Sequence, residues 1–245
     1  MIRLSSDEIA FFKQEGYVVK RGVLDPALMA CAQDQLWAGA PPRLNRHQPE
    51  TWVGAFAEDR FTWKYREPGH EPWMIELLAT NPSIQAMAEQ LLGSGTLQTP
   101  ERVRGIYCIF PAGDAPAPPV RLHVDQHPFH LGVVGYIDDV APGGGGFTVW
   151  PGSHRKFYYD FTTRYTFNAT ANYATDRDYY NSQPPTECPG QAGDIIFWHH
   201  RIGHSAGYNR TNRIRQAVLY DFKKNDLVAT QDLPPAADMW EDWAI

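Results

Sequence analysis

Cysteine is scarce in this chain of 245 residues, which contains only Cys31, Cys108 and Cys188. An odd number of widely spaced cysteines, with no C-x-x-C pair, argues against a disulfide framework and against a cysteine-ligated zinc site. Apolar runs long enough to cross a bilayer are missing, and the first residues lack the basic and apolar regions of a signal peptide. We therefore expect a soluble, cytoplasmic protein without a membrane partner.

Positive charge is also in short supply, because 22 Lys and Arg residues stand against 28 Asp and Glu residues and leave a formal net charge of −6. Nucleic acids and anionic membranes attract basic surfaces, so we expect neither as a partner. Hydrophobic residues make up 43% of the chain, which is typical of a globular protein. The length suits one all-β barrel or sandwich, and we expect a single domain over residues 1–245.

The pattern of residues 1–95 predicts a helical support region. Ser5 and Glu8 have the spacing of a capping box, in which each side chain accepts a hydrogen bond from the other residue's backbone N–H. Residues 17–20 predict a short strand, and residues 40–62 a loop with some strand. The three expected helices run from Ser5 to Gly16, from Asp25 to about Trp37 and from Asn81 to Gly93.

From about residue 96 the texture changes to short β-rich runs separated by Gly and Pro turns. The runs are residues 103–110, 122–125, 131–137, 147–150, 194–199 and 214–222. Such spacing is typical of a β-sandwich or barrel, so we expect the core of the domain at residues 96–232. The tail after Leu233 should dock through its aromatic side chains.

His123 and Asp125 are two residues apart on an expected strand, so their side chains should point the same way. One imidazole and one carboxylate make two-thirds of the 2-His-1-carboxylate triad that holds Fe(II) and leaves other coordination positions open. The third ligand must be a histidine from elsewhere. His204 is the best candidate, and His199 and His200 crowd the same segment as alternatives.

Several segments resemble the phytanoyl-CoA dioxygenase-like branch of the Fe(II)/2-oxoglutarate oxygenases. The matching segments are residues 4–12, 15–19, 123–125, 137–142 and 145–154, then Gly193-Asp194 with His204 and Asn209. The resemblance implies a mainly β fold with N-terminal α-helices and a double-stranded β-helix (jelly-roll, cupin-like) core. It also implies the cofactors Fe(II), 2-oxoglutarate and O2, and the hydroxylation of a small organic molecule with release of succinate and CO2.

The resemblance assigns roles to individual residues. It makes His123, Asp125 and His204 the iron ligands, with no catalytic residue beyond them. In the family, an Arg eleven residues after the distal His holds the far carboxylate of 2-oxoglutarate, and here that residue is Arg215. The planar guanidinium suits this bidentate task. Arg213, two residues earlier on the same strand face, is the fallback.

Other candidate contacts are less specific. By the same resemblance, Lys64 is a further contact of 2-oxoglutarate. Tyr107 and Thr148 are candidates for the same role, because both lie on strands expected to line the barrel. His127 and Trp150 are the candidate substrate contacts, although a core position is the plainer interpretation of Trp150.

Residues 157–185 stand apart from the rest of the core region, because they are polar and yet contain nine Phe or Tyr residues. We expect a long, partly ordered loop, and loops of this length are often functional. Its place between two core strands suggests a lid over the substrate.

Two other functions are open on the sequence. A halogenase replaces the metal carboxylate with a small residue, and Asp125 argues against this. A non-catalytic or cosubstrate-independent metal-binding jelly roll needs no Arg at the metal cavity, so Arg215 argues against it. Arg104 and Arg121 are candidates for binding an anionic substrate, although solvated surface positions are the plainer expectation for both.

Overall fold

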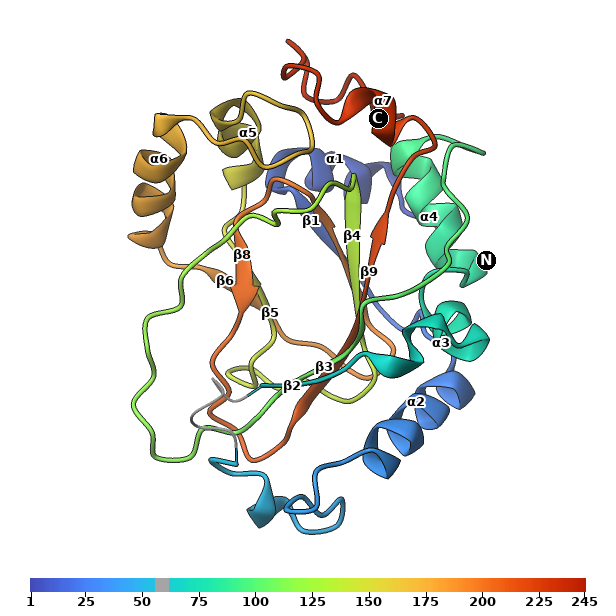
Figure 1. Ribbon diagram of the computed structural model, residues 1–245, viewed down its shortest axis with the longest axis vertical. Helices are drawn as coiled ribbons and strands as arrows, with labels where there is room; N and C mark the ends of the chain where they lie inside the picture. The colour runs from blue at the N-terminus through green and yellow to red at the C-terminus, as the bar shows by residue number, and fades with distance from the viewer. Residues whose placement is uncertain (56–61) are drawn as a thin grey trace.

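The computed structural model describes residues 1–55 and 62–245, and its two antiparallel sheets face each other (Figure 1). The larger sheet has the strand order β1-β7-β4-β9-β3-β2 and the smaller one β6-β5-β8. The strands are β1 (Tyr17–Lys20), β2 (Thr62–Tyr65), β3 (Gly105–Ile109), β4 (Leu131–Tyr136), β5 (Phe147–Val149), β6 (Thr186–Cys188), β7 (Ile195–His199), β8 (His204–Ala206) and β9 (Arg215–Phe222). The expected jelly-roll core is confirmed.

The N-terminal helices cover the outer face of the larger sheet (Figure 1). The helices are α1 (Ser6–Glu15), α2 (Pro26–Ala38), α3 (Pro72–Leu77), α4 (Pro82–Leu92), α5 (Ser153–Phe157), α6 (Ala171–Asn181) and α7 (Leu227–Thr230), with 3₁₀ turns η1 (Pro49–Thr51), η2 (Glu67–His70) and η3 (Tyr158–Asp160). No helix among the described residues combines the length and apolar character that crossing a membrane requires.

The predicted caps explain where these helices begin and end. The Ser5 hydroxyl accepts from the Glu8 backbone N–H at 3.2 Å, and the Glu8 carboxylate accepts from the Ser5 N–H at 2.7 Å. Gly16 ends α1 in the left-handed conformation, with φ 81°. The sequence did not indicate α3, which has six residues and no side-chain cap. Part of the loop expected at 40–62 lies outside the described residues.

Alternation along the strands separates two cores. On β9, Val218 faces the helices, whereas Ala217 faces the smaller sheet. Between the sheets, Trp198 packs its ring directly over Gly132, where an added Cβ would overlap the indole. Gly132 of β4 is the cross-strand partner of Trp198 on β7, so the missing side chain leaves room for the indole on the inner face of the larger sheet. Phe147 completes the contact from the smaller sheet, with its ring centroid 4.9 Å from that of Trp198.

Residues 157–185 are ordered, and the prediction of a loop is wrong for much of this segment. It contains η3 and α6, and Phe161 and Tyr173 pack with Leu122 and Val124 in a third apolar cluster. Asn181, the last residue of α6, accepts a hydrogen bond from the Leu122 backbone N–H at 2.9 Å. The segment therefore supports the stretch just before the His-x-Asp motif. Its role as a lid stays a prediction.

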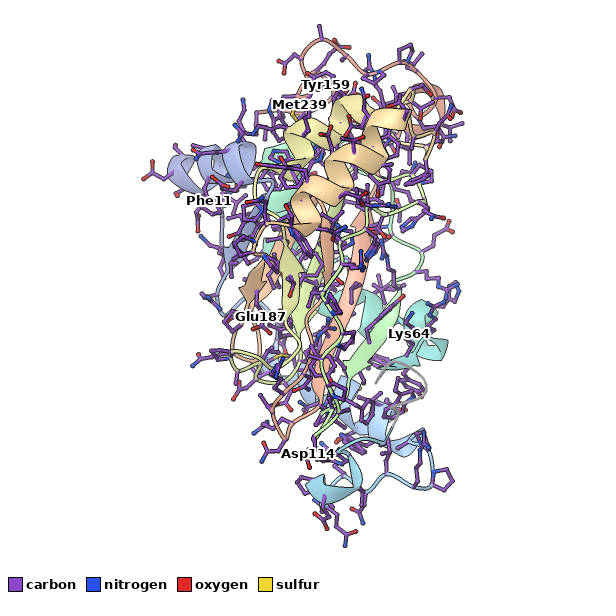
Figure 2. The ribbon with its side chains drawn as sticks, turned by 90° about the vertical axis from the view of Figure 1, so that its left-hand side faces the viewer. Phe11, Lys64, Asp114, Tyr159, Glu187 and Met239 are labelled. Carbon is purple, nitrogen blue, oxygen red and sulfur yellow. The ribbon has the colours of Figure 1, made fainter. Side chains whose placement is uncertain are left out.

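The C-terminal tail docks through its aromatic side chains, as expected. Trp243 stacks on His199 with ring centroids 5.0 Å apart and also packs on Phe12 of α1. The Tyr159 hydroxyl donates to the Ala237 carbonyl at 2.9 Å, and Figure 2 shows Tyr159 beside Met239 at one end of the molecule. The tail thus joins the N-terminal helix to the α5–α6 region.

Four buried histidines should make the fold sensitive to acid. Burial lowers the pKa of His130 to about 4 and that of His154 to about 3, and it holds the pKa of His199 and His200 well below the ordinary value of an imidazole. Unfolded histidines titrate near pH 6.5. Between these values only the unfolded chain takes up protons, so the free energy of unfolding should fall as the pH drops from 7 towards 4.

Asp160 acts in the opposite direction, because burial raises its pKa to about 6, but it is one group against four. We expect urea unfolding at pH 5.0 to show a free energy of unfolding lower by at least about 1 kcal/mol than at pH 7.5. An equal or higher midpoint at pH 5.0 would contradict these burial effects.

Candidate active site

A single antiparallel bridge brings two histidines together across the molecule. The His123 N–H donates to the His204 carbonyl and the His204 N–H to the His123 carbonyl, both at 3.0 Å. The ring centroids lie 4.4 Å apart. His204 belongs to β8, where it pairs with Val149 of β5 and faces the space between the sheets. The expected strand at 122–125 is reduced to this bridge.

Asp125 completes a three-residue cluster with these histidines. Its Oδ2 lies 3.5 Å from His204 Nε2. One ligand atom from each of His123, Asp125 and His204 lies within 4.8 Å of the others. Two imidazoles and one carboxylate at this spacing fit the donor set of a non-haem Fe(II) site. The structure therefore brings together the three residues that the sequence selected.

The protonation of the cluster suits metal binding. His204 Nδ1 lies 3.0 Å from the Ile202 carbonyl, and since a carbonyl only accepts, Nδ1 carries the proton and Nε2 is free to bind a metal. Burial and the neighbouring His204 lower the pKa of His123 to about 4. Burial opposes ionisation of Asp125, but His204 and Arg104 outweigh it and lower its pKa to about 2. At neutral pH, therefore, His123 is uncharged and Asp125 is ionised, which are the forms that bind a cation.

We predict that His204→Ala lowers metal affinity far more than His199→Gln. His199 lies in the buried aromatic cluster under the tail, packed against His154 and Trp243, and therefore has no access to the metal. Removing a direct ligand should exceed the roughly 10- to 100-fold cost of removing an outer partner. Anaerobic calorimetric titration with Ni(II) measures both variants, and equal affinities would refute the assignment of His204.

Asp125 is joined to an ion-pair network that contains Arg104 and Asp221. Arg104 donates from Nε and Nη2 to the two oxygens of Asp221, both at 2.6 Å, and from Nη2 to Asp125 Oδ2 at 3.3 Å. His127 Nε2 lies 2.8 Å from Asp221 Oδ2. The Arg104 side chain is 21% exposed and the two carboxylates 10% each. Such outer partners orient a metal carboxylate, which makes Arg104 a positioning residue.

We predict that Arg104→Gln weakens metal binding about 10- to 100-fold, because Asp125 loses its fixed orientation and Asp221 keeps only His127 as a partner. Arg121→Gln is the matched control, since Arg121 lines the same cavity without an ion pair among the described residues. The measurement is Ni(II) affinity of both variants by calorimetry. An Arg104→Gln protein that binds Ni(II) as tightly as the control would remove Arg104 from this role.

Next to the metal cluster is a cavity of about 880 Å³, and Arg215 lies in its wall. Arg215 is only 5% exposed. Its Nε donates to the Gly145 carbonyl at 3.0 Å and its Nη1 to the Tyr107 carbonyl at 3.3 Å, and no carboxylate of the described residues pairs with it. A buried guanidinium without a counter-ion is costly unless a ligand supplies one.

Arg213, the fallback, lies on the surface. Its side chain is 58% exposed and its Nη2 donates to Asp138 at 2.7 Å. Arg213 precedes the first residue of β9, so it does not share the strand face of Arg215. The structure places Arg215 and not Arg213 at the cavity.

The remaining candidates divide into two groups. Lys64 and Tyr107 line the cavity, with Lys64 Nζ 5.2 Å from the centre of the Tyr107 ring. Thr148 and Trp150 do not, because Phe147 and Val149 occupy the inward positions of β5 and the alternate residues point away. The Thr148 hydroxyl donates to Gly146 and the Trp150 indole N–H to Gln183.

Sequence reasoning missed the Arg104–Asp221 pair and found His127 without its partner. One signal was available, because Asp221 follows Arg215 by an even number of residues on β9 and therefore shares its face. The partner, Arg104, is 117 residues away in the chain, and no local pattern connects the two.

The chain is similar to a known protein family over most of its length. Residues 12–217 match the phytanoyl-CoA dioxygenase (PhyH) family, and the chain belongs to that family. It is accordingly an iron- and 2-oxoglutarate-dependent oxygenase, as the sequence predicted. The chain is also similar to the chicken (Gallus gallus) 2-oxoglutarate and iron-dependent oxygenase JMJD4, with 28% identity in an alignment 109 residues long that covers 39% of this chain. The match spans only 26% of JMJD4.

Three solved structures share the fold. The first is the non-haem α-ketoglutarate-dependent carbocyclase SnoK from nogalamycin biosynthesis, with 20% identity, a TM-score of 0.59 and coverage of 96% of this chain and 95% of SnoK. The second is EctD from S. alaskensis, at 16% and 0.60, covering 97% and 82%. The third is HygX from Streptomyces hygroscopicus with nickel and 2-oxoglutarate bound, at 14% and 0.60, covering 95% and 97%.

Proposed function

We propose that this oxygenase hydroxylates, or otherwise oxidises, a small organic molecule, with conversion of 2-oxoglutarate to succinate and CO2. His123, Asp125 and His204 hold Fe(II) through two imidazoles and one carboxylate. The observation that carries the proposal is the meeting of these three donors beside a buried, unpaired arginine. Bound iron, with 2-oxoglutarate and O2, supplies the oxidising power that an unactivated C–H bond requires.

Arg215 binds the far carboxylate of 2-oxoglutarate in this proposal. Its guanidinium is held by the Gly145 and Tyr107 carbonyls, so its direction is fixed before the ligand arrives. Burial lowers the pKa of Arg215, which means that the charged form gains from an anionic partner. Lys64 and Tyr107 remain candidates for further contacts with the cosubstrate, since both line the same cavity.

The cavity also supports a small-molecule substrate. A volume of about 880 Å³ lies in the range of pockets that hold organic ligands. Among the similar structures, one of EctD contains 2-oxoglutarate and 5-hydroxyectoine. His127, exposed beside Asp221, is retained as a candidate substrate contact.

The three cysteines are free, which fits the reducing cytoplasm as the place of action.

The alternatives fit less well. A halogenase lacks the metal-binding carboxylate, whereas this chain has Asp125 at that position, and Arg104 holds the Asp125 carboxylate in place. A non-catalytic jelly roll has no use for Arg215, a buried cation that lacks a counter-ion among the described residues. The site is therefore that of an oxygenase that uses a dicarboxylate cosubstrate.

We predict that Arg215→Ala raises the 2-oxoglutarate concentration needed for half-maximal succinate release by roughly 10- to 100-fold, because one charge-assisted pair of about 1.5–3 kcal/mol is lost. Fe(II) affinity should change little. Arg213→Ala is the matched control, since Arg213 pairs with Asp138 on the surface.

The measurement is succinate release in the presence of Fe(II) and O2, with 2-oxoglutarate binding by calorimetry as a second readout. Equal requirements in the two variants, or a larger effect of Arg213→Ala, would overturn the assignment of the cosubstrate to Arg215.

A further inference from the structure

A second cavity adjoins the metal cavity. It has a volume of about 630 Å³ and shares two lining residues, Arg104 and Tyr107, with the metal cavity. Its other basic lining residues are Arg66, Arg102 and Lys223. The shared residues make it a side chamber of the candidate active site.

The sheet topology explains why these cations meet. β2, β3 and β9 are antiparallel neighbours in the larger sheet. Arg66 directly follows β2, Arg102 lies just before β3 and Lys223 directly follows β9. Because the strands are antiparallel, the end of β2, the start of β3 and the end of β9 lie side by side at one end of the strands. Three segments far apart in the chain therefore each bring a positive charge to the same place. Figure 2 labels Lys64, which lies on β2 two residues before Arg66.

The positive charge in this chamber is not balanced. Among the carboxylates whose side chains the structure describes, a set that leaves out Glu67, none lies within 4.0 Å of the charged groups of Arg66, Arg102 or Lys223. The acidic lining residues are Glu101 and Asp221, and both Asp221 oxygens already accept from Arg104. The whole chain carries a net charge of −6, so a group of cations here does not reflect its composition.

The positive charges also affect Lys64 and Tyr107, which lie beside the chamber. Burial and then the charges of Arg66 and Arg104 lower the pKa of Lys64. Tyr107 links the two cavities, because its hydroxyl accepts from Arg66 Nη2 at 3.2 Å while its ring faces Lys64. Like charges held together repel each other, and a bound anion removes that cost.

The cosubstrate does not supply this anion. With Fe(II) bound, the two charges of 2-oxoglutarate are opposed by Arg215 and by the positive charge that the metal retains beside Asp125. Arg104 is neutralised by Asp221. Arg66, Arg102 and Lys223 then face one remaining acidic lining residue, Glu101, so the chamber keeps an excess of two positive charges for the substrate.

We propose that the chamber lined by Arg66, Arg102 and Lys223 binds an oxyanion of the substrate, a carboxylate or a phosphate, while the part to be oxidised reaches the metal past Tyr107. This inference rests on the proposed function for its substrate role. Guanidinium and ammonium groups form charge-assisted hydrogen bonds with both kinds of anion. The substrate class is thus an organic acid or an organic phosphate.

The test is calorimetric titration of the metal-free 245-residue chain with inorganic phosphate and with butyrate. The variant is Arg66→Gln/Arg102→Gln/Lys223→Gln. The matched control, Arg3→Gln/Arg155→Gln/Lys156→Gln, removes the same charge and the same residue types outside the lining of either cavity. All six side chains are exposed or half-buried, so both variants should keep the wild-type unfolding midpoint.

We expect saturable binding of at least one of the two anions by the wild type and the control, and binding at least about tenfold weaker in the variant. The anion that binds identifies the group as phosphate or carboxylate. Absence of saturable binding in the wild type, equal affinity in the variant, or an equal loss in the control would overturn the proposal. Since no metal, 2-oxoglutarate or turnover is involved, failure here is distinguishable from failure of the proposed function.

Discussion

The candidate active site depends on two backbone hydrogen bonds, those between His123 and His204. They join a short irregular stretch to an edge strand of the smaller sheet, and each is 3.0 Å long. Without them the two imidazoles would belong to unconnected parts of the chain. α6 supports this bridge, because Asn181 binds the Leu122 backbone and Tyr173 packs in the same apolar cluster. The aromatic-rich segment at residues 157–185 thus supports the metal centre structurally.

A second constraint is the placement of buried charge. β9 carries Arg215 and Asp221 on its inward face, at opposite ends of the strand. Asp221 is neutralised within the protein by Arg104, which also reaches Asp125. Arg215 has only carbonyl partners. One strand therefore supplies two charges with different roles. Asp221 is paired with Arg104 and so helps to orient the metal ligand Asp125, whereas Arg215 is unpaired and can bind a dicarboxylate.

Local patterns predicted much of the fold. The capping box at Ser5 and the glycine at 16 act within a few residues, so the sequence alone locates α1. The His-x-Asp spacing correctly paired His123 with Asp125, although the strand expected there is reduced to a single bridge. The sequence missed α6, whose residues are polar and whose stability comes from distant partners of Tyr173. Thr148 was placed at the cavity by strand membership, but alternation within β5 turns it away. The partner of Asp221 is set by tertiary contact alone.

The central claim is that one site holds iron and 2-oxoglutarate together, and spectroscopy tests it most directly. Fe(II) and then 2-oxoglutarate are added anaerobically to the wild type and to His123→Ala, and the visible spectrum is recorded. We predict a weak charge-transfer band in the wild type that saturates at one iron per chain and is absent in His123→Ala. No band in the wild type, or the same band in His123→Ala, would contradict the assignment of the site.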